Sequence, residues 1–138
     1  MRPYIGVYQF GGMQMTVAEM RAMLDRDAKL IENEEFDKLM DVYINDAIMV
    51  LPGQIIQGKE ALKIAHKKIA KYFDHTLKLR HGNMKLFETG DTILVLDQTF
   101  VESDKFNEER KATYVYRKIN GEWLCAIDNS YGTALLDE

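Results

Sequence analysis

The sequence of 138 residues contains one cysteine, two prolines and one tryptophan. A single cysteine, Cys125, excludes a disulfide within the chain and is typical of proteins from a reducing compartment, so we expect a cytoplasmic protein. No apolar stretch approaches the roughly 20 residues that a membrane-spanning helix needs. Residues 1–15 also lack the continuous apolar block of a signal peptide. We therefore expect no association with a membrane.

An excess of charge of one sign is also missing. The net charge is -4, from 18 basic and 22 acidic residues, which argues against a general nucleic-acid binder. We expect His66 on the flank of a helix over residues 59–73, at the surface or partly buried, and His75 and His81 near strand ends. These histidines and the cysteine show no spacing typical of a metal site, and we expect neither a metal nor a cofactor. The hydrophobic fraction of 46% and the charged fraction of 29% fit one soluble domain with an apolar core. We assign residues 16–138 to this domain and residues 1–15 to a flexible leader.

Helical patterns dominate the first half of the chain. Thr16, followed three residues later by Glu19, is typical of a capping box, and apolar residues recur at helical spacing over residues 17–32. The other elements predicted in this half are a short helix after Asn33, strands over 47–51 and 55–56, and a helix over 59–73.

Strand patterns fill the second half. We predict strands over 77–79, 84–88, 92–103, 112–119 and 123–131, with turns at Gly82-Asn83, 89–91 and Asn120-Gly121 and an exposed connection over 104–110. Helices that precede a run of strands indicate an α+β fold, with the helices packed on one face of a mainly antiparallel sheet.

The strand over 92–103 is apolar on both faces, with Val95 on one face and Leu94, Leu96 and Phe100 on the other. A strand that is exposed on one side should instead alternate apolar and polar residues. Three helices can cover only one face of such a sheet, so the other face needs a cover. We expect a second copy of the chain there, which gives a homodimer through the sheet. A face that tolerates exposed apolar residues is the alternative.

Three motifs carry a resemblance to a known superfamily. Residues 34–47 (EEFDKLMDVYINDA), continued by MVLPG at 49–53 and GKEAL at 58–62, resemble the nuclear transport factor 2-like (NTF2-like, SnoaL-like) proteins. NGEWLCAIDNS at 120–130 resembles the C-terminal motif of the same superfamily. The resemblance covers residues 17–132. Within the superfamily the chain resembles uncharacterised bacterial SnoaL-like proteins most, and it is also similar to the association domain of calcium/calmodulin-dependent kinase II.

This resemblance implies a cone-shaped, cystatin-like α+β barrel. In such a barrel, a curved sheet wraps around three N-terminal helices, leaves a pocket inside and dimerises through its outer face. The resemblance does not fix an activity, because the same cone serves isomerases, cyclases, dehydratases and non-catalytic modules. Steroid isomerases carry an aspartate base before the proline that corresponds to Pro52. Leu51 stands at that position here, which argues against their reaction.

Asp27 is the most informative candidate for a functional residue. It falls inside the apolar stripe of the first predicted helix, where an unpaired charge is costly. Its carboxyl must therefore find a partner, take a raised pKa or line a wet cavity. The alternative is a structural aspartate held by hydrogen bonds.

Strand alternation supplies the other candidates. Alignment with the kinase association domain implies that Thr99, Tyr114 and Ser130 face inward, and alternation then turns Asp97, Tyr116 and Asp128 inward as well. We predict Asp27, Asp97 and Asp128 as acid/base residues, and as ligand-binding residues we predict Tyr43, Thr99, Tyr114, Tyr116 and Ser130. Carboxylates near tyrosines in an apolar cleft can serve as general acids and bases. A polar network that only positions strands is the alternative.

The sequence thus favours a protein that binds a small, largely apolar molecule and acts on it by cofactor-free isomerisation, cyclisation or dehydration. The alternative is a non-catalytic ligand-binding or dimerisation module.

Overall fold

A computed structural model describes residues 14–137. The first helix, α1, spans Val17–Glu32. The Thr16 hydroxyl accepts a hydrogen bond from the Glu19 backbone N–H, and the Glu19 side chain accepts one from the Thr16 backbone, which forms the predicted capping box. The buried face of α1 carries Met20, Leu24 and Asp27.

The second predicted helix is short. It consists of α2 (Phe36–Leu39) and the 3₁₀ turn η1 (Met40–Val42), and it leads directly into strand β1 (Tyr43–Leu51). The hairpin partner of β1 is β2 (Gln54–Gln57), and α3 (Lys59–Tyr72) follows. Leu62 is fully buried on α3, and Ala65, His66 and Ala70 are buried beside it.

Four long strands complete the chain: β3 (Lys78–Thr89), β4 (Thr92–Glu102), β5 (Glu108–Ile119) and β6 (Glu122–Asn129). The 3₁₀ segment η2 (Gly132–Asp137) follows β6. All strands belong to one sheet in the order β2-β1-β6-β5-β4-β3. Only the β1–β6 pair is parallel, because the other neighbours are joined as antiparallel hairpins or meanders.

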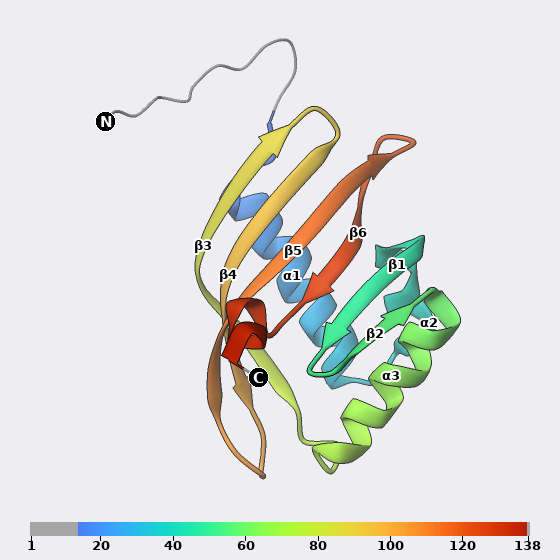
Figure 1. The fold of residues 1–138 in the computed structure, drawn as a ribbon, viewed down its shortest axis with the longest axis vertical. Helices are drawn as coiled ribbons and strands as arrows, with labels where there is room; N and C mark the ends of the chain where they lie inside the picture. The colour runs from blue at the N-terminus through green and yellow to red at the C-terminus, as the bar shows by residue number, and fades with distance from the viewer. Residues whose placement is uncertain (1–13, 138) are drawn as a thin grey trace.

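The sheet is curved and does not close into a full barrel (Figure 1). Helix α1 lies behind β3, β4 and β5, and α3 lies beside β1 and β2. The core fills the concave face between these layers. The predicted α+β cone is therefore confirmed, and the helices cover one face of the sheet, as expected.

Three of the sequence-based boundaries were wrong. Gly82-Asn83 is not a turn, because β3 runs through it as a bulge in which residues 82 and 83 face Gln98 alone. β1 begins at Tyr43 and not at residue 47, and it runs through a register shift at Asn45-Asp46. β5 begins at Glu108, inside the predicted connection. A bulge keeps ladder pairing while it breaks strict alternation, so composition alone does not separate it from a turn. The predicted leader, residues 1–15, falls almost entirely outside the described range.

The bulges decide which polar side chains face inward. His81 and Met84 are three residues apart, yet they pair with Thr99 and Asp97, which share one face of β4. The pairing of β5 with β6 also shifts between Val115 and Tyr116, which puts the extra residue Ala126 between Cys125 and Ile127. The bulge in β3 therefore brings His81 and Met84 to the same face, which strict alternation along β3 does not predict.

Candidate functional site

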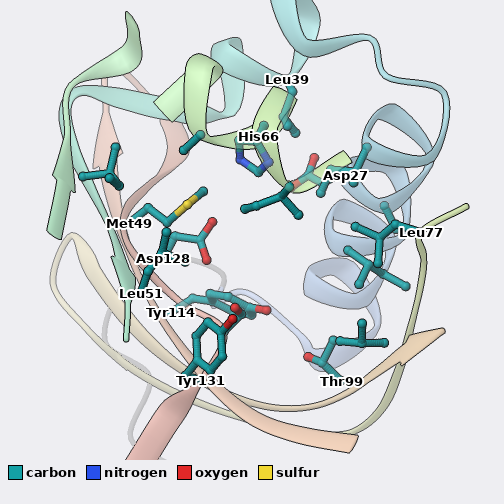
Figure 2. A pocket seen from close by; sticks show the side chains of 18 of the residues that line it. Asp27, Leu39, Met49, Leu51, His66, Leu77, Thr99, Tyr114, Asp128 and Tyr131 are labelled. Atoms are coloured by element: carbon teal, nitrogen blue, oxygen red, sulfur yellow. The ribbon is translucent and has the colours of Figure 1, made fainter. Parts of the chain in front are cut away.

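A cavity of about 680 Å³ opens between the concave face of the sheet and helices α1 and α3. Most of its wall is apolar, and its size suits a small organic ligand. Figure 2 shows the side chains of Asp27, His66, Tyr114 and Asp128 converging on this hollow from different elements. The cavity thus combines apolar walls with a few polar groups, an arrangement typical of ligand sites.

All but one of the predicted site residues line this cavity: Asp27, Tyr43, Thr99, Tyr114, Tyr116, Asp128 and Ser130. Asp97 is buried behind the wall, where its carboxyl is hydrogen-bonded to His81, a residue that does line the cavity. The structure therefore brings the predicted residues together around one cavity, and Asp97 contacts this cavity only through the residues it binds.

Asp27 presents a carboxyl group without a close partner. The residue is 9% exposed, and its Oδ1 atom accepts no hydrogen bond. The Arg26 Nε atom lies 3.8 Å from this oxygen, but the Arg26 side chain is 62% exposed and the pair is weak. The pKa of Asp27 is raised to about 6, chiefly by burial; Arg26 and His81 oppose the rise, and the negative charge of Asp128 adds to it. Asp27 can therefore bind and release a proton near neutral pH.

A second group joins Asp97, Thr99 and His81. Asp97 Oδ2 accepts hydrogen bonds from Thr99 Oγ1 at 2.7 Å and from His81 Nδ1 at 2.6 Å. These contacts place the Nδ1 proton of His81 on the Asp97 side and leave Nε2 as the reactive nitrogen of the ring. A carboxylate that orients a histidine in this way is a recurring arrangement in acid/base sites.

Helix α1 secures the backbone of His81. Arg21 donates hydrogen bonds from Nη1 to the His81 carbonyl at 2.9 Å and from Nη2 to the Gly82 carbonyl at 2.6 Å. These carbonyls belong to the β3 bulge, which loses part of its ladder pairing to β4. One arginine therefore fixes the bulge that turns His81 into the cavity.

A third group links Asp128, Tyr43 and His66. The Tyr43 hydroxyl donates to Asp128 Oδ2 at 2.7 Å, and His66 Nε2 lies 3.0 Å from the same hydroxyl. Because the hydroxyl has one proton, His66 must donate to it through Nε2–H. Burial lowers the pKa of His66 to about 4, so the ring is neutral at physiological pH. Burial raises the pKa of Asp128, and the hydrogen bond from Tyr43 opposes that rise.

Sequence reasoning missed His66 and His81. His66 was expected at the flank of the third helix, at the surface or partly buried, but it is buried against Phe36 and Tyr43. His81 was expected near a strand end, because Gly82-Asn83 was interpreted as a turn. The inward position of His81 follows from its cross-strand pairing with Thr99, and this pairing cannot be deduced from the sequence alone.

No group of three or more His, Cys, Asp or Glu side chains in residues 14–137 could hold a metal ion. None of the helices in that range is long and apolar enough to cross a membrane.

No family model and no curated protein matches the chain. Solved structures do match it. A cystatin-like protein of unknown function from Nostoc punctiforme aligns at 18% identity, with a TM-score of 0.68, over 83% of this chain and 91% of that one. A candidate dehydratase of the NTF2-like family from Streptomyces avermitilis aligns at 17% identity, with a TM-score of 0.59, over 80% and 92%.

A candidate calcium/calmodulin-dependent protein kinase type II association domain from Thiobacillus denitrificans aligns at 17% identity, with a TM-score of 0.61, over 78% of this chain and 90% of that one. At these identities the likeness establishes the fold alone. The chain has the NTF2-like, cystatin-like fold, and the resemblance found in its motifs is confirmed at that level.

Proposed function

We propose that this protein binds a small, largely apolar molecule in its cavity and catalyses a cofactor-free proton transfer on it, of the isomerase, cyclase or dehydratase type. The cavity supplies the apolar surface for binding. The polar groups on its wall supply the acid and the base that such reactions need.

The observation that carries the proposal is the Asp27 carboxyl, which is buried in the cavity wall with an unpartnered oxygen and a pKa of about 6. The Asp97 Oδ1 atom is also buried without a partner, but Asp97 does not line the cavity, whereas Asp27 does. Because the Asp27 oxygen has no donor and lies in the wall of the cavity, it can accept a proton from a bound ligand. Asp27 is therefore the proposed proton acceptor.

His81 is the proposed second proton-transfer group. Asp97 holds its Nδ1 side, and His81 and Asp27 line the same cavity. Isomerisation, cyclisation and dehydration each remove one proton and deliver one elsewhere, so two groups on one wall suffice. Asp97 thereby becomes a positioning residue. The candidate dehydratase from Streptomyces avermitilis shows that this fold has been associated with such chemistry.

The test begins with a thermal-shift screen of small apolar metabolites. Each compound that binds is then incubated with the protein in D₂O, and its exchange of hydrogen for deuterium is followed by NMR. We expect exchange at one position, lost in Asp27→Asn while binding persists, and retained in the control Asp25→Asn, which changes an exposed carboxyl on the same helix. Ligands that bind but never exchange in the unmodified protein would contradict the catalytic part of the proposal.

One observation favours the non-catalytic alternative, a module that binds ligand or dimerises. The outer face of the sheet carries a row of cross-strand partners, Phe87, Leu94, Val115, Ile127 and Ile48, which runs from β3 to β1. Phe87 is 54% exposed and Leu94 39% exposed, although such side chains are normally covered. We propose that a second copy covers this row in a homodimer, and that the protein acts in the cytoplasm.

A further inference from the structure

The Asp128 carboxyl lies among tyrosines and lacks a cation. Tyr43 donates to its Oδ2, and Tyr114 is its partner in the β5–β6 ladder. Burial raises the pKa of the hydroxyls of Tyr43, Tyr114 and Tyr116 well above the ordinary value, and the negative charge of Asp128 raises each of them further. No lysine or arginine of the described residues forms an ion pair with Asp128. Its charge is therefore surrounded by aromatic side chains and left uncompensated.

The histidines and arginine of the cavity do not supply the missing charge. His66 is neutral, because burial holds its pKa near 4. His81 is paired with Asp97. Arg110 forms an ion pair with Glu108, and its guanidinium lies 4.2 Å from the centre of the Tyr131 ring. Lys68 also lines the cavity, but this residue is exposed and forms an ion pair with neither Asp27 nor Asp128.

Asp27 adds an independent sign of a missing donor. Its Oδ1 is buried, unpartnered and part of the same cavity wall, and the charge of Asp128 acts on it. A buried carboxylate oxygen without a donor costs free energy that a ligand could relieve. Two carboxyl groups therefore face one hollow, and the ligand itself is the natural source of a positive donor.

We propose that the ligand of this cavity carries a protonated amine, which binds Asp128 between the rings of Tyr43, Tyr114 and Tyr116, with its apolar body against the rest of the wall. An ammonium group satisfies a carboxylate by hydrogen bonds and is attracted to tyrosine faces. The inference rests on the proposed ligand binding and names its chemical class. Asp128 then anchors the ligand, and Asp27 remains free to exchange a proton with it.

The test compares three probes of one shape: benzylamine, benzyl alcohol and benzoate. Calorimetry at about pH 8, where the amine is largely protonated, measures each dissociation constant with the full chain. We expect benzylamine to bind at least tenfold more tightly than benzyl alcohol, and benzoate to bind most weakly of the three. Asp128→Asn should abolish the preference for the amine, while Asp46→Asn, an exposed carboxyl on β1, should keep it.

The comparison among probes needs only the unmodified protein, so it decides the matter even if Asp128→Asn fails to fold. Benzyl alcohol or benzoate binding as tightly as benzylamine would overturn the inference and leave the proposed ligand binding intact. An amine preference that survives in Asp128→Asn would overturn the assignment to Asp128. If none of the probes binds, the inference fails, and the proposed function is then judged by the metabolite screen alone.

Discussion

At the scale of single residues, Asp27 determines part of the dependence of stability on pH. Its pKa is about 6 in the folded chain against an ordinary value of 3.8, so the fold disfavours the ionised carboxyl. This contribution to stability is fully present below the unfolded pKa and is lost as the pH rises through about 6. We therefore predict that Asp27→Asn raises the free energy of unfolding at about pH 8, by roughly 2 kcal/mol, as measured by urea denaturation.

The advantage of Asp27→Asn should shrink as the pH falls from about 6 toward and below about 4, because the wild-type carboxyl is then protonated in the folded state and increasingly also in the unfolded state. Asp25→Asn, on the exposed side of α1, should show no such pH-dependent difference. A destabilised Asp27→Asn at neutral pH would indicate that the carboxylate is a structural hydrogen-bond acceptor and would refute the prediction.

His66 makes a second prediction at this scale. Burial lowers its pKa to about 4, and its Nε2–H donates to Tyr43, so the ring should remain neutral well below the pH at which a free histidine takes up a proton. Between about pH 8 and pH 5.5, the ring resonances of His66 in a two-dimensional NMR spectrum should not shift. Their assignment would come from comparison with His66→Gln. A midpoint near 6.5 would show that the ring is solvated.

The contrast between Asp27 and His81 shows which site residues can be predicted from sequence. Asp27 interrupts an apolar stripe of helical period, and a helix keeps that period along its whole length, so its inward position follows from spacing. His81 lies beside a strand bulge, where alternation breaks down. Its inward position depends on the register with β4, which is set by contacts distant in sequence. The same reason hides the link between Asp97 and His81.

At the scale of elements, the contact between α1 and β3 should be the most sensitive to a single substitution. Arg21 donates two hydrogen bonds to carbonyl groups of the β3 bulge, and one of these carbonyls belongs to His81. Arg21→Met keeps much of the aliphatic stem and removes both donors. Hydrogen bonds from charged donors contribute about 1.5–3 kcal/mol, so we predict a loss of stability of about 2 kcal/mol by urea denaturation.

Lys29→Met, an exposed cation elsewhere on α1, serves as the matched control and should change stability little. In Arg21→Met the ring resonances of His81 should also shift, because the backbone that carries the ring is released. Equal stability of the two variants would mean that β4 alone holds the bulge.

Elements whose signals lie within their own segment were predictable, and an element defined by its pairing with another strand was not. Helix α1 begins at a capping box and ends as predicted, because both signals lie within the segment itself. The Asn120-Gly121 turn was recognised for the same reason, and both residues adopt the positive φ that such a turn needs. The bulge at Gly82-Asn83 was read as a turn, because glycine and asparagine favour both. The pairing that distinguishes the two is made with β4.

At the scale of the whole molecule, the curved sheet has two apolar faces that serve different purposes. The concave face is covered by α1 and α3 and contains the cavity, and the outer face retains its apolar row from Phe87 to Ile48. Alternation along β4 revealed both faces from sequence, because the positions of Ile93, Leu94 and Val95 within the strand already assign each residue to one face. The shape and volume of the cavity depend on the curvature of the sheet, which no local pattern encodes.

The last prediction concerns the outer face. If a second copy covers it, light scattering coupled to size-exclusion chromatography should give twice the 16.0 kDa mass of the chain. Leu94→Lys places a charge in the middle of the apolar row, where burial without a partner is costly, and should convert the dimer to a monomer. Ile64→Lys alters an exposed isoleucine on α3 and should leave the dimer intact. A monomeric wild-type protein would contradict the prediction, and Phe87 and Leu94 would then be apolar residues that the fold tolerates in water.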